Sequence, residues 1–179
     1  MKKMILLLTA IAVALVTQDI SAQKFSGLDK SPHDIAYYRT QRSAPPLVKV
    51  IYGRPQKKGR KIFGGIVSYG DVWRTGANEA TEITFYKDAT FGGKQVKAGT
   101  YTLFTVPGEK EWTVILNSDL DVWGAYSYNK AKDVARVTVP VEKDSKSLEA
   151  FSIAFNQVGD DVHLTLAWDQ DRVAVPIKM

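Results

Sequence analysis

Apolar and polar residues alternate along most of the chain after residue 46. Val48, Val50 and Tyr52 would share one face of an extended strand, and the residues between them would share the other. The same period of two recurs at residues 81–87, 100–106, 112–116, 134–142, 148–157, 162–168 and 173–177. Together with a short strand near residues 95–96, this pattern predicts about nine strands.

Turn signals separate these segments at short intervals. Gly92-Gly93, Pro107-Gly108 and Gly159 favour tight reversals, and residues 169–171 are also expected to form a turn. Residues 100–106 are apolar or β-branched on both faces, which predicts a central strand. The residues expected to face the core are Ile83, Phe85, Trp112, Val114, Leu116, Ala135, Val137, Val139, Val141, Phe151, Ile153, Phe155, Val162, Leu164, Leu166 and Trp168.

No segment after residue 22 shows a convincing helical period, although residues 147–155 come nearest to one. Many short strands joined by frequent turns are typical of antiparallel sandwiches and barrels. We therefore expect an all-β fold, a single antiparallel β-sandwich or flattened barrel over residues 46–179. Residues 23–45 form an N-terminal lead-in, in which residues 31–34 could begin an edge strand.

Residues 1–22 have the pattern of a secretory signal peptide. Lys2 and Lys3 give the positive start, residues 5–16 are apolar, and small residues precede Gln23. The apolar run is shorter than the ~20 residues that a membrane-spanning helix needs. We expect a cleaved leader and an exported protein, periplasmic or secreted, that does not span the membrane.

The chain contains no cysteine, and its formal net charge is +5. A domain of this length can bury a sufficient core without disulfides. Lysine and arginine cluster at residues 56–61, but a short basic loop of this kind usually points into solvent. We therefore expect no nucleic-acid partner.

Residues 58–81 concentrate glycine, arginine, tryptophan, asparagine and glutamate, and they contain the strongest candidates for a binding site. These candidates are Trp73, Arg74, Asn78 and Glu79, because a guanidinium, an amide and a carboxylate together could hold a sugar or a carboxylate ligand. The alternative is structural. In that case Arg74 pairs with Glu79 or with buried carbonyl groups, and Asn78 caps a turn.

A second candidate segment is the aromatic loop at residues 117–132. Its residues Trp123, Tyr126 and Tyr128 could form a stacking platform for a carbohydrate or peptide. Alternatively, they cover the end of the core. If they bind a ligand, this loop and residues 73–79 should converge on one concave site.

Catalysis is not indicated. Glycoside hydrolysis by Glu79 needs a second carboxylate at a defined distance, and Glu82 is expected to point to the opposite face of its strand or along it. Asp119 and Asp121 lack the oxygen-rich loop of a calcium site.

The histidines His33 and His163 lack the partners of a zinc site or a nucleophile pair. We therefore expect no catalytic residue, no metal and no cofactor.

Several motifs follow one another along nearly all of the chain after the leader: Gly59-Arg60-Lys61-Ile62-Phe63-Gly64-Gly65, Trp73-Arg74-Thr75-Gly76-Ala77-Asn78-Glu79-Ala80-Thr81, Ala98-Gly99-Thr100-Tyr101, Pro107-Gly108, Trp112-Thr113 and Trp123-Gly124-Ala125. In this order they resemble a secreted bacterial family described as domain of unknown function 2911. The resemblance implies an exported all-β domain. The resemblance gives no activity and no catalytic residue that could be assigned to this chain.

The function predicted from the sequence is therefore a non-catalytic ligand-binding module for a small molecule, a glycan, a peptide or another envelope-derived ligand. One alternative is a structural or partner-binding envelope protein, for which Arg74 and Glu79 should be buried and satisfy each other. A further alternative is a hydrolase of envelope polymers that uses Glu79.

Overall fold

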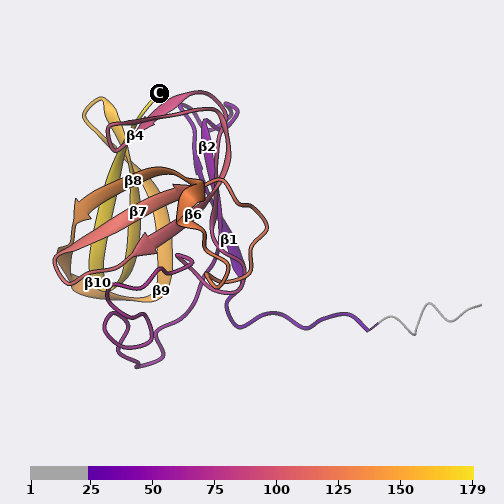
Figure 1. Cartoon of the computed structure of the whole chain (residues 1–179), viewed down its shortest axis with the longest axis vertical. Helices are drawn as coiled ribbons and strands as arrows, with labels where there is room; N and C mark the ends of the chain where they lie inside the picture. Colours follow the sequence, from indigo (N-terminus) through magenta and orange to yellow (C-terminus); the bar gives the residue numbers. More distant parts are fainter. Residues whose placement is uncertain (1–23) are drawn as a thin grey trace, which may run out of the picture.

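The computed structural model describes residues 24–179, most of which lie in two antiparallel sheets (Figure 1). The first sheet contains, in spatial order, β1 (His33–Tyr38), β2 (Val48–Gly53), β3 (Glu82–Phe85), β6 (Gly99–Val106), β7 (Glu111–Asn117) and β8 (Asp133–Pro140). The second contains β5 (Lys94–Val96), β4 (Ala89–Phe91), β10 (Asp161–Lys178) and β9 (Glu142–Val158). One turn of 3-10 helix, Lys130–Lys132, precedes β8.

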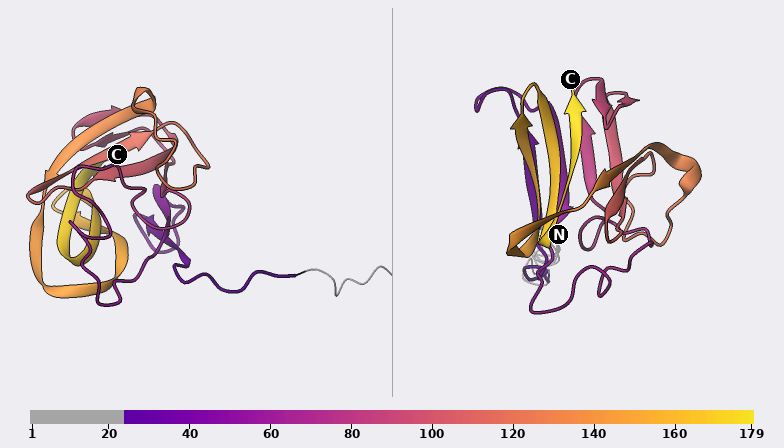
Figure 2. Two further views of the ribbon diagram at one scale, coloured as in Figure 1. Left: turned by 60° about the horizontal axis from the view of Figure 1, so that its bottom comes forward. Right: turned by 90° about the vertical axis from the view of Figure 1, so that its left-hand side faces the viewer.

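The two sheets face each other across one hydrophobic core, so the predicted β-sandwich is confirmed and the barrel alternative is not (Figure 2). Val114 and Leu116 of the first sheet and Phe151 and Leu164 of the second are fully buried. Side chains alternate along each strand, and these four residues lie on the inner faces of the sheets, as the sequence predicted. The predicted central strand β6 lies between β3 and β7.

The C-terminal hairpin is longer than expected. We expected a turn at residues 169–171, but β10 runs without a break through this segment while paired with β9 (yellow in Figure 1). The register shifts on either side of Asp169, which has a positive φ of 50°. Because Asp169 pairs with Leu148 and Asp171 pairs with Lys143, the extra residues at these shifts lie on β9. The turn-like sequence therefore stays in the strand opposite an irregular segment of β9 and does not reverse the chain.

The expected lead-in contributes the edge strand β1, which pairs with β2 from His33 opposite Gly53 to Tyr38 opposite Val48. Within residues 24–179, no helix has the length and apolar character needed to cross a membrane. The predicted signal peptide, residues 1–22, lies outside the described residues.

Five aromatic rings close one end of the core and join both sheets to the long connection between β2 and β3. Phe63 and Trp73 of this connection pack against Trp112 of β7, with centroid separations of 4.7 and 6.2 Å. Trp73 also packs on Phe151 of β9 at 5.0 Å and stacks on Trp168 of β10 at 5.9 Å. The connection, which includes the purple loops at the bottom of Figure 1, is thus fixed by the core.

Close backbone packing holds the same connection against the end of β2. A Cβ atom at Gly53 would overlap the carbonyl oxygen of Ala77. A Cβ atom at Gly76 would lie 2.8 Å from the carbonyl oxygen of Gly53. Only glycine therefore allows these two segments to approach so closely.

We predict that Gly53→Ala destabilises the fold by about 2 kcal/mol or more, because the backbone of Ala77 must move to admit a methyl group. Chemical denaturation of both proteins measures this loss. Gly27→Ala is the matched control, since a Cβ atom at Gly27 has no heavy atom within 4 Å. Equal stability of the two variants would contradict the close packing described here.

Candidate functional site

The predicted site residues lie in one region of the molecule but not in one pocket. Trp73, Arg74 and Asn78 line one pocket, whereas Glu79 lines another. Trp123 and Tyr126 are exposed on the neighbouring loop, and the partly buried Tyr128 packs against the core. Backbone hydrogen bonds tie the two candidate segments together, from Gly124 N to Asn78 O at 3.0 Å and from Ala80 N to Val122 O at 2.9 Å.

The first pocket, here called the basic pocket, has a volume of about 320 Å³. Its polar lining consists of Ser31, Arg60, Arg74 and Asn78, and no acidic side chain lines it. The indole rings of Trp73 and Trp168 contribute apolar wall. Two guanidinium groups without a lining carboxylate favour an anionic ligand.

The segment before β1 passes beside this pocket. The backbone N–H of Ser31 donates to Asp29 Oδ1 at 2.6 Å. This hydrogen bond, followed by one from the Asn78 side chain, lowers the pKa of Asp29. The amide of Asn78 thus has a carboxylate partner at the edge of the basic pocket.

Arg74 does not pair with Glu79. The Nε atom of Arg74 is buried and has no hydrogen-bond partner among the described residues. Glu79 instead places its Oε2 atom 3.3 Å from His33 Nε2, and its side chain is 57% exposed. The mutual pairing of Arg74 and Glu79, which the structural alternative predicts, is therefore not found, because the two side chains line different pockets.

The loop that carries Arg74 is held in an unusual conformation. Thr75 and Asn78 have positive φ angles of 56° and 64°. This backbone conformation has a higher energy for the β-branched Thr75 than for Asn78. Buried hydrogen bonds maintain it, because Thr75 Oγ1 donates to Thr105 Oγ1 at 3.2 Å and Thr81 Oγ1 donates to Thr75 O at 2.7 Å. The loop is therefore preorganised by the core.

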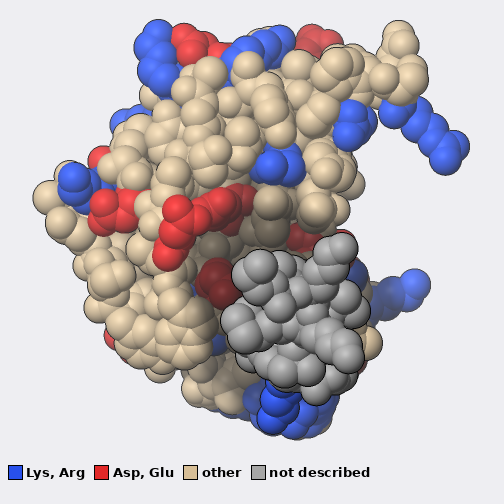
Figure 3. All heavy atoms as spheres, turned by 90° about the vertical axis from the view of Figure 1, so that its right-hand side faces the viewer, with Lys and Arg blue, Asp and Glu red and all other residues tan. Residues whose placement is uncertain are grey.

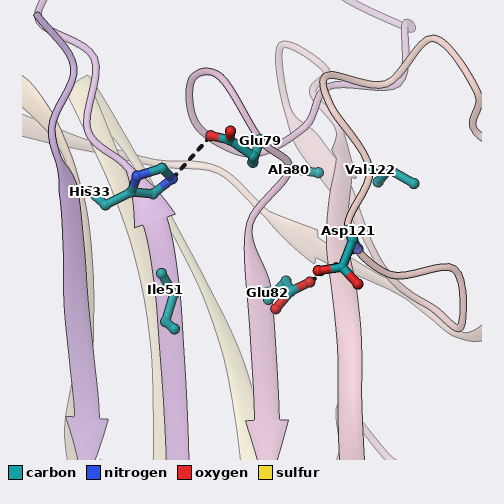
Figure 4. Close-up of a pocket in the computed structure, with 7 residues that line it drawn as sticks. All are labelled: His33, Ile51, Glu79, Ala80, Glu82, Asp121 and Val122. Carbon is teal, nitrogen blue, oxygen red and sulfur yellow. Dashed lines mark hydrogen bonds and ion pairs between the residues drawn. The ribbon is translucent and has the colours of Figure 1, made fainter. Parts of the chain in front are cut away.

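The second pocket, here called the acidic pocket, has a volume of about 150 Å³ and is shown in Figure 4. Glu79, Glu82 and Asp121 line it together with His33. The backbone N–H of Asp121 donates to Glu82 Oε1 at 3.2 Å. In the space-filling view of Figure 3, acidic side chains gather across the middle of one face, some of them recessed.

The expectation that Glu82 would point away from Glu79 is wrong. Both side chains line the acidic pocket, because residues 79–81 lie outside β3 and do not alternate as a strand does. Across residues 24–179, no group of three or more histidine, aspartate and glutamate side chains is arranged to hold a metal ion.

Trp123 and Tyr126 form an exposed pair, here called the aromatic ledge. Their ring centroids lie 5.7 Å apart with an interplanar angle of 18°. Trp123 is the cross-strand partner of Glu79 in an isolated antiparallel bridge. The ledge thus lies beside the acidic pocket, since Asp121 and Val122 of that pocket directly precede Trp123.

Tyr128 has a structural environment instead. Its ring packs edge to face on Phe104 at 5.2 Å, and its hydroxyl donates to Asp133 Oδ2 at 2.6 Å. Arg136 Nη1 donates to the same hydroxyl at 2.8 Å. Burial, followed by the hydrogen bond to Asp133, raises the pKa of Tyr128 to about 12.

Sequence reasoning missed Ser31, His33 and Arg60 as pocket residues. Arg60 stands in the basic cluster that was expected to be a solvated turn, and His33 had no partner near it in sequence. A composition shift at residues 56–61 was the available signal for Arg60. Nothing in the sequence placed Ser31 or His33 beside residues 74–79.

We predict that Tyr128→Phe weakens the alkaline sensitivity of the fold. Because the native pKa of about 12 exceeds the ordinary value of 10, the Tyr128 proton stabilises the native state below pH 10, and this stabilisation is lost as pH rises toward 12. Denaturant unfolding at several pH values in this window measures the effect. The wild-type protein should lose more stability than the variant, and parallel losses would contradict this assignment.

No curated protein and no solved structure matches this chain. The family described as "Protein of unknown function (DUF2911)" matches residues 31–177, from the segment before β1 to the residue before Lys178, the last residue of β10. This range includes both pockets and the aromatic ledge. Because the match covers most of the chain, the protein belongs to the DUF2911 family.

Proposed function

We propose that this protein is a non-catalytic ligand-binding module whose primary site is the basic pocket. The observation that carries the proposal is the buried Nε atom of Arg74, which has no hydrogen-bond partner among the described residues and belongs to a side chain that lines the pocket. A buried donor without a partner costs about 1–3 kcal/mol. A ligand that accepts this hydrogen bond would recover part of that cost.

The proposed ligand is a small molecule that carries a carboxylate. Arg74 and Arg60 would attract its charge, and the fork geometry of a guanidinium matches the two oxygens of a carboxylate. Trp73 and Trp168 would contact its apolar part. The hydrogen bonds that fix Thr75 reduce the ordering cost of binding.

The predicted signal peptide supports an exported location for this activity. An exported module would meet acidic sugars, peptide termini and similar envelope-derived carboxylates. The structural alternative predicted that Arg74 and Glu79 would be buried and satisfy each other, and the exposed His33–Glu79 pair weighs against it.

We predict that Arg74→Met abolishes carboxylate binding without lowering stability, because methionine keeps apolar packing and removes the unpartnered donor. Thermal shift and calorimetry with D-glucuronate, N-acetylmuramate and C-terminal dipeptides would measure both effects.

Arg42→Ala is the matched control, because Arg42 lines a different surface pocket. A wild-type protein that binds none of these carboxylates, or that binds them as well after Arg74→Met, would contradict the proposal. A large fall in melting temperature in Arg74→Met would indicate that Arg74 has a structural role.

The acidic pocket favours a second candidate function, hydrolysis of an envelope polymer. Glu79, Glu82 and Asp121 line it together, so a second carboxylate lies near Glu79. If this candidate is right, the wild-type protein releases new reducing ends from cell-wall polysaccharides. Glu79→Gln should then reduce the rate by at least about 100-fold, within the usual range for a general acid or base. Absence of turnover by the wild-type protein eliminates this candidate.

A further inference from the structure

The aromatic ledge is a strongly exposed pair of stacked aromatic rings. Trp123 is 60% exposed and Tyr126 is 81% exposed. The other three tryptophans, Trp73, Trp112 and Trp168, are buried or partly buried in the aromatic cluster of the core. Large aromatic side chains are usually well buried, so this exposed pair is a candidate contact surface for a ligand.

The pair is also held in place. Gly124 has a φ of 72°, and a Cβ atom there would lie 2.6 Å from the Tyr126 ring. The Tyr126 ring therefore lies directly over the backbone at Gly124 and stacks nearly parallel to Trp123. The hydrogen bond from Gly124 N to Asn78 O anchors the loop below. A ledge presented in this way loses little conformational entropy when a ligand binds.

Polar groups lie beside the ledge on one side. Because Glu79 and Trp123 are partners in an antiparallel bridge, their side chains project to the same face of the two segments. The Glu79 carboxylate is more than half exposed and opens on the acidic pocket, which is also lined by Asp121. A flat aromatic surface thus stands next to carboxylate oxygens that accept hydrogen bonds.

The area of the ledge limits the class of ligand. Aromatic side chains bury about 150–250 Å² each, so this pair offers far less than the ~800 Å² per partner of a stable protein–protein interface. The area suits a ring of six atoms. A pyranose has an apolar face of C–H groups that can lie on an indole, and a rim of hydroxyl groups that can donate to carboxylates.

We propose that the aromatic ledge and Glu79 form a sugar-binding subsite for a pyranose residue of a glycan. Trp123 stacks on the apolar face of the ring, Tyr126 supports the indole from behind, and Glu79 accepts a hydroxyl hydrogen bond. This subsite is separate from the basic pocket, shares no lining residue with it and does not depend on carboxylate binding there.

The experiment is a titration of the full-length mature protein with cellohexaose, maltohexaose, xylohexaose and chitohexaose. Because Trp123 is the one strongly exposed tryptophan of the described chain, binding should shift its fluorescence emission and protect it from iodide quenching. Calorimetry gives the affinity. Trp123→Ala and Tyr126→Ala should each weaken binding at least about tenfold, and Trp123→Phe should weaken it less, because phenylalanine keeps a smaller stacking face.

Glu79→Gln separates stacking from hydrogen bonding, since glutamine keeps the shape but makes a weaker acceptor. It should reduce affinity while leaving the melting temperature unchanged. Tyr86→Ala is the matched control, because Tyr86 is a half-exposed aromatic residue that belongs to neither pocket nor to the ledge, and this variant should bind sugar normally.

Three results would overturn the proposal. The first two are binding of none of the four oligosaccharides and binding that survives Trp123→Ala. The third is binding that depends on Trp123 but is seen only with unrelated peptides of similar length, because such a result would assign the ledge to a peptide and not to a sugar. Failure of carboxylate binding at Arg74 would leave this proposal unaffected.

Discussion

Packing of aromatic rings between the sheets is the interaction on which the rest of the structure depends. Trp112 comes from the first sheet, Trp168 and Phe151 come from the second, and Phe63 and Trp73 come from the connection that crosses the open end. Together these rings join both sheets to that connection. They also fix Trp73, and the residue that follows Trp73 is Arg74. The position of the candidate binding residue is thus a consequence of core packing.

In the candidate site, the backbone is tightly packed while one buried side-chain donor is unsatisfied among the described residues. The backbone of residues 75–78 packs against the end of β2 so closely that only glycine fits at Gly53. Positive φ angles at Thr75 and Asn78 accompany this approach, and buried threonine hydroxyl groups hold it. Among residues 24–179, this geometry gives the Arg74 Nε atom no hydrogen-bond partner. Residues held in strained conformations cluster at functional sites, which supports this loop as the candidate site.

Residues close together in the sequence line pockets of opposite charge. Asn78 lines the basic pocket and Glu79 lines the acidic one, although they are adjacent in sequence. The aromatic ledge joins the acidic side through the bridge between Glu79 and Trp123. The single concave site expected from the sequence is therefore divided into two surfaces with opposite charge preference. The two proposed ligands, a carboxylate and a sugar, would therefore bind at separate places.

The sequence by itself determined the fold class, because strand alternation and glycine turns are local: Gly92-Gly93 joins β4 to β5, and the inward residues of β7 and β9 could be named in advance. It also indicated which residues to examine. It could not distinguish a turn from a continuous strand at residues 169–171, since the local residue preferences favour a turn and only the pairing with β9 keeps the chain extended. Only the tertiary structure decided that Glu79 meets His33 and not Arg74, because side-chain direction in an irregular loop is set by long-range packing and not by sequence spacing.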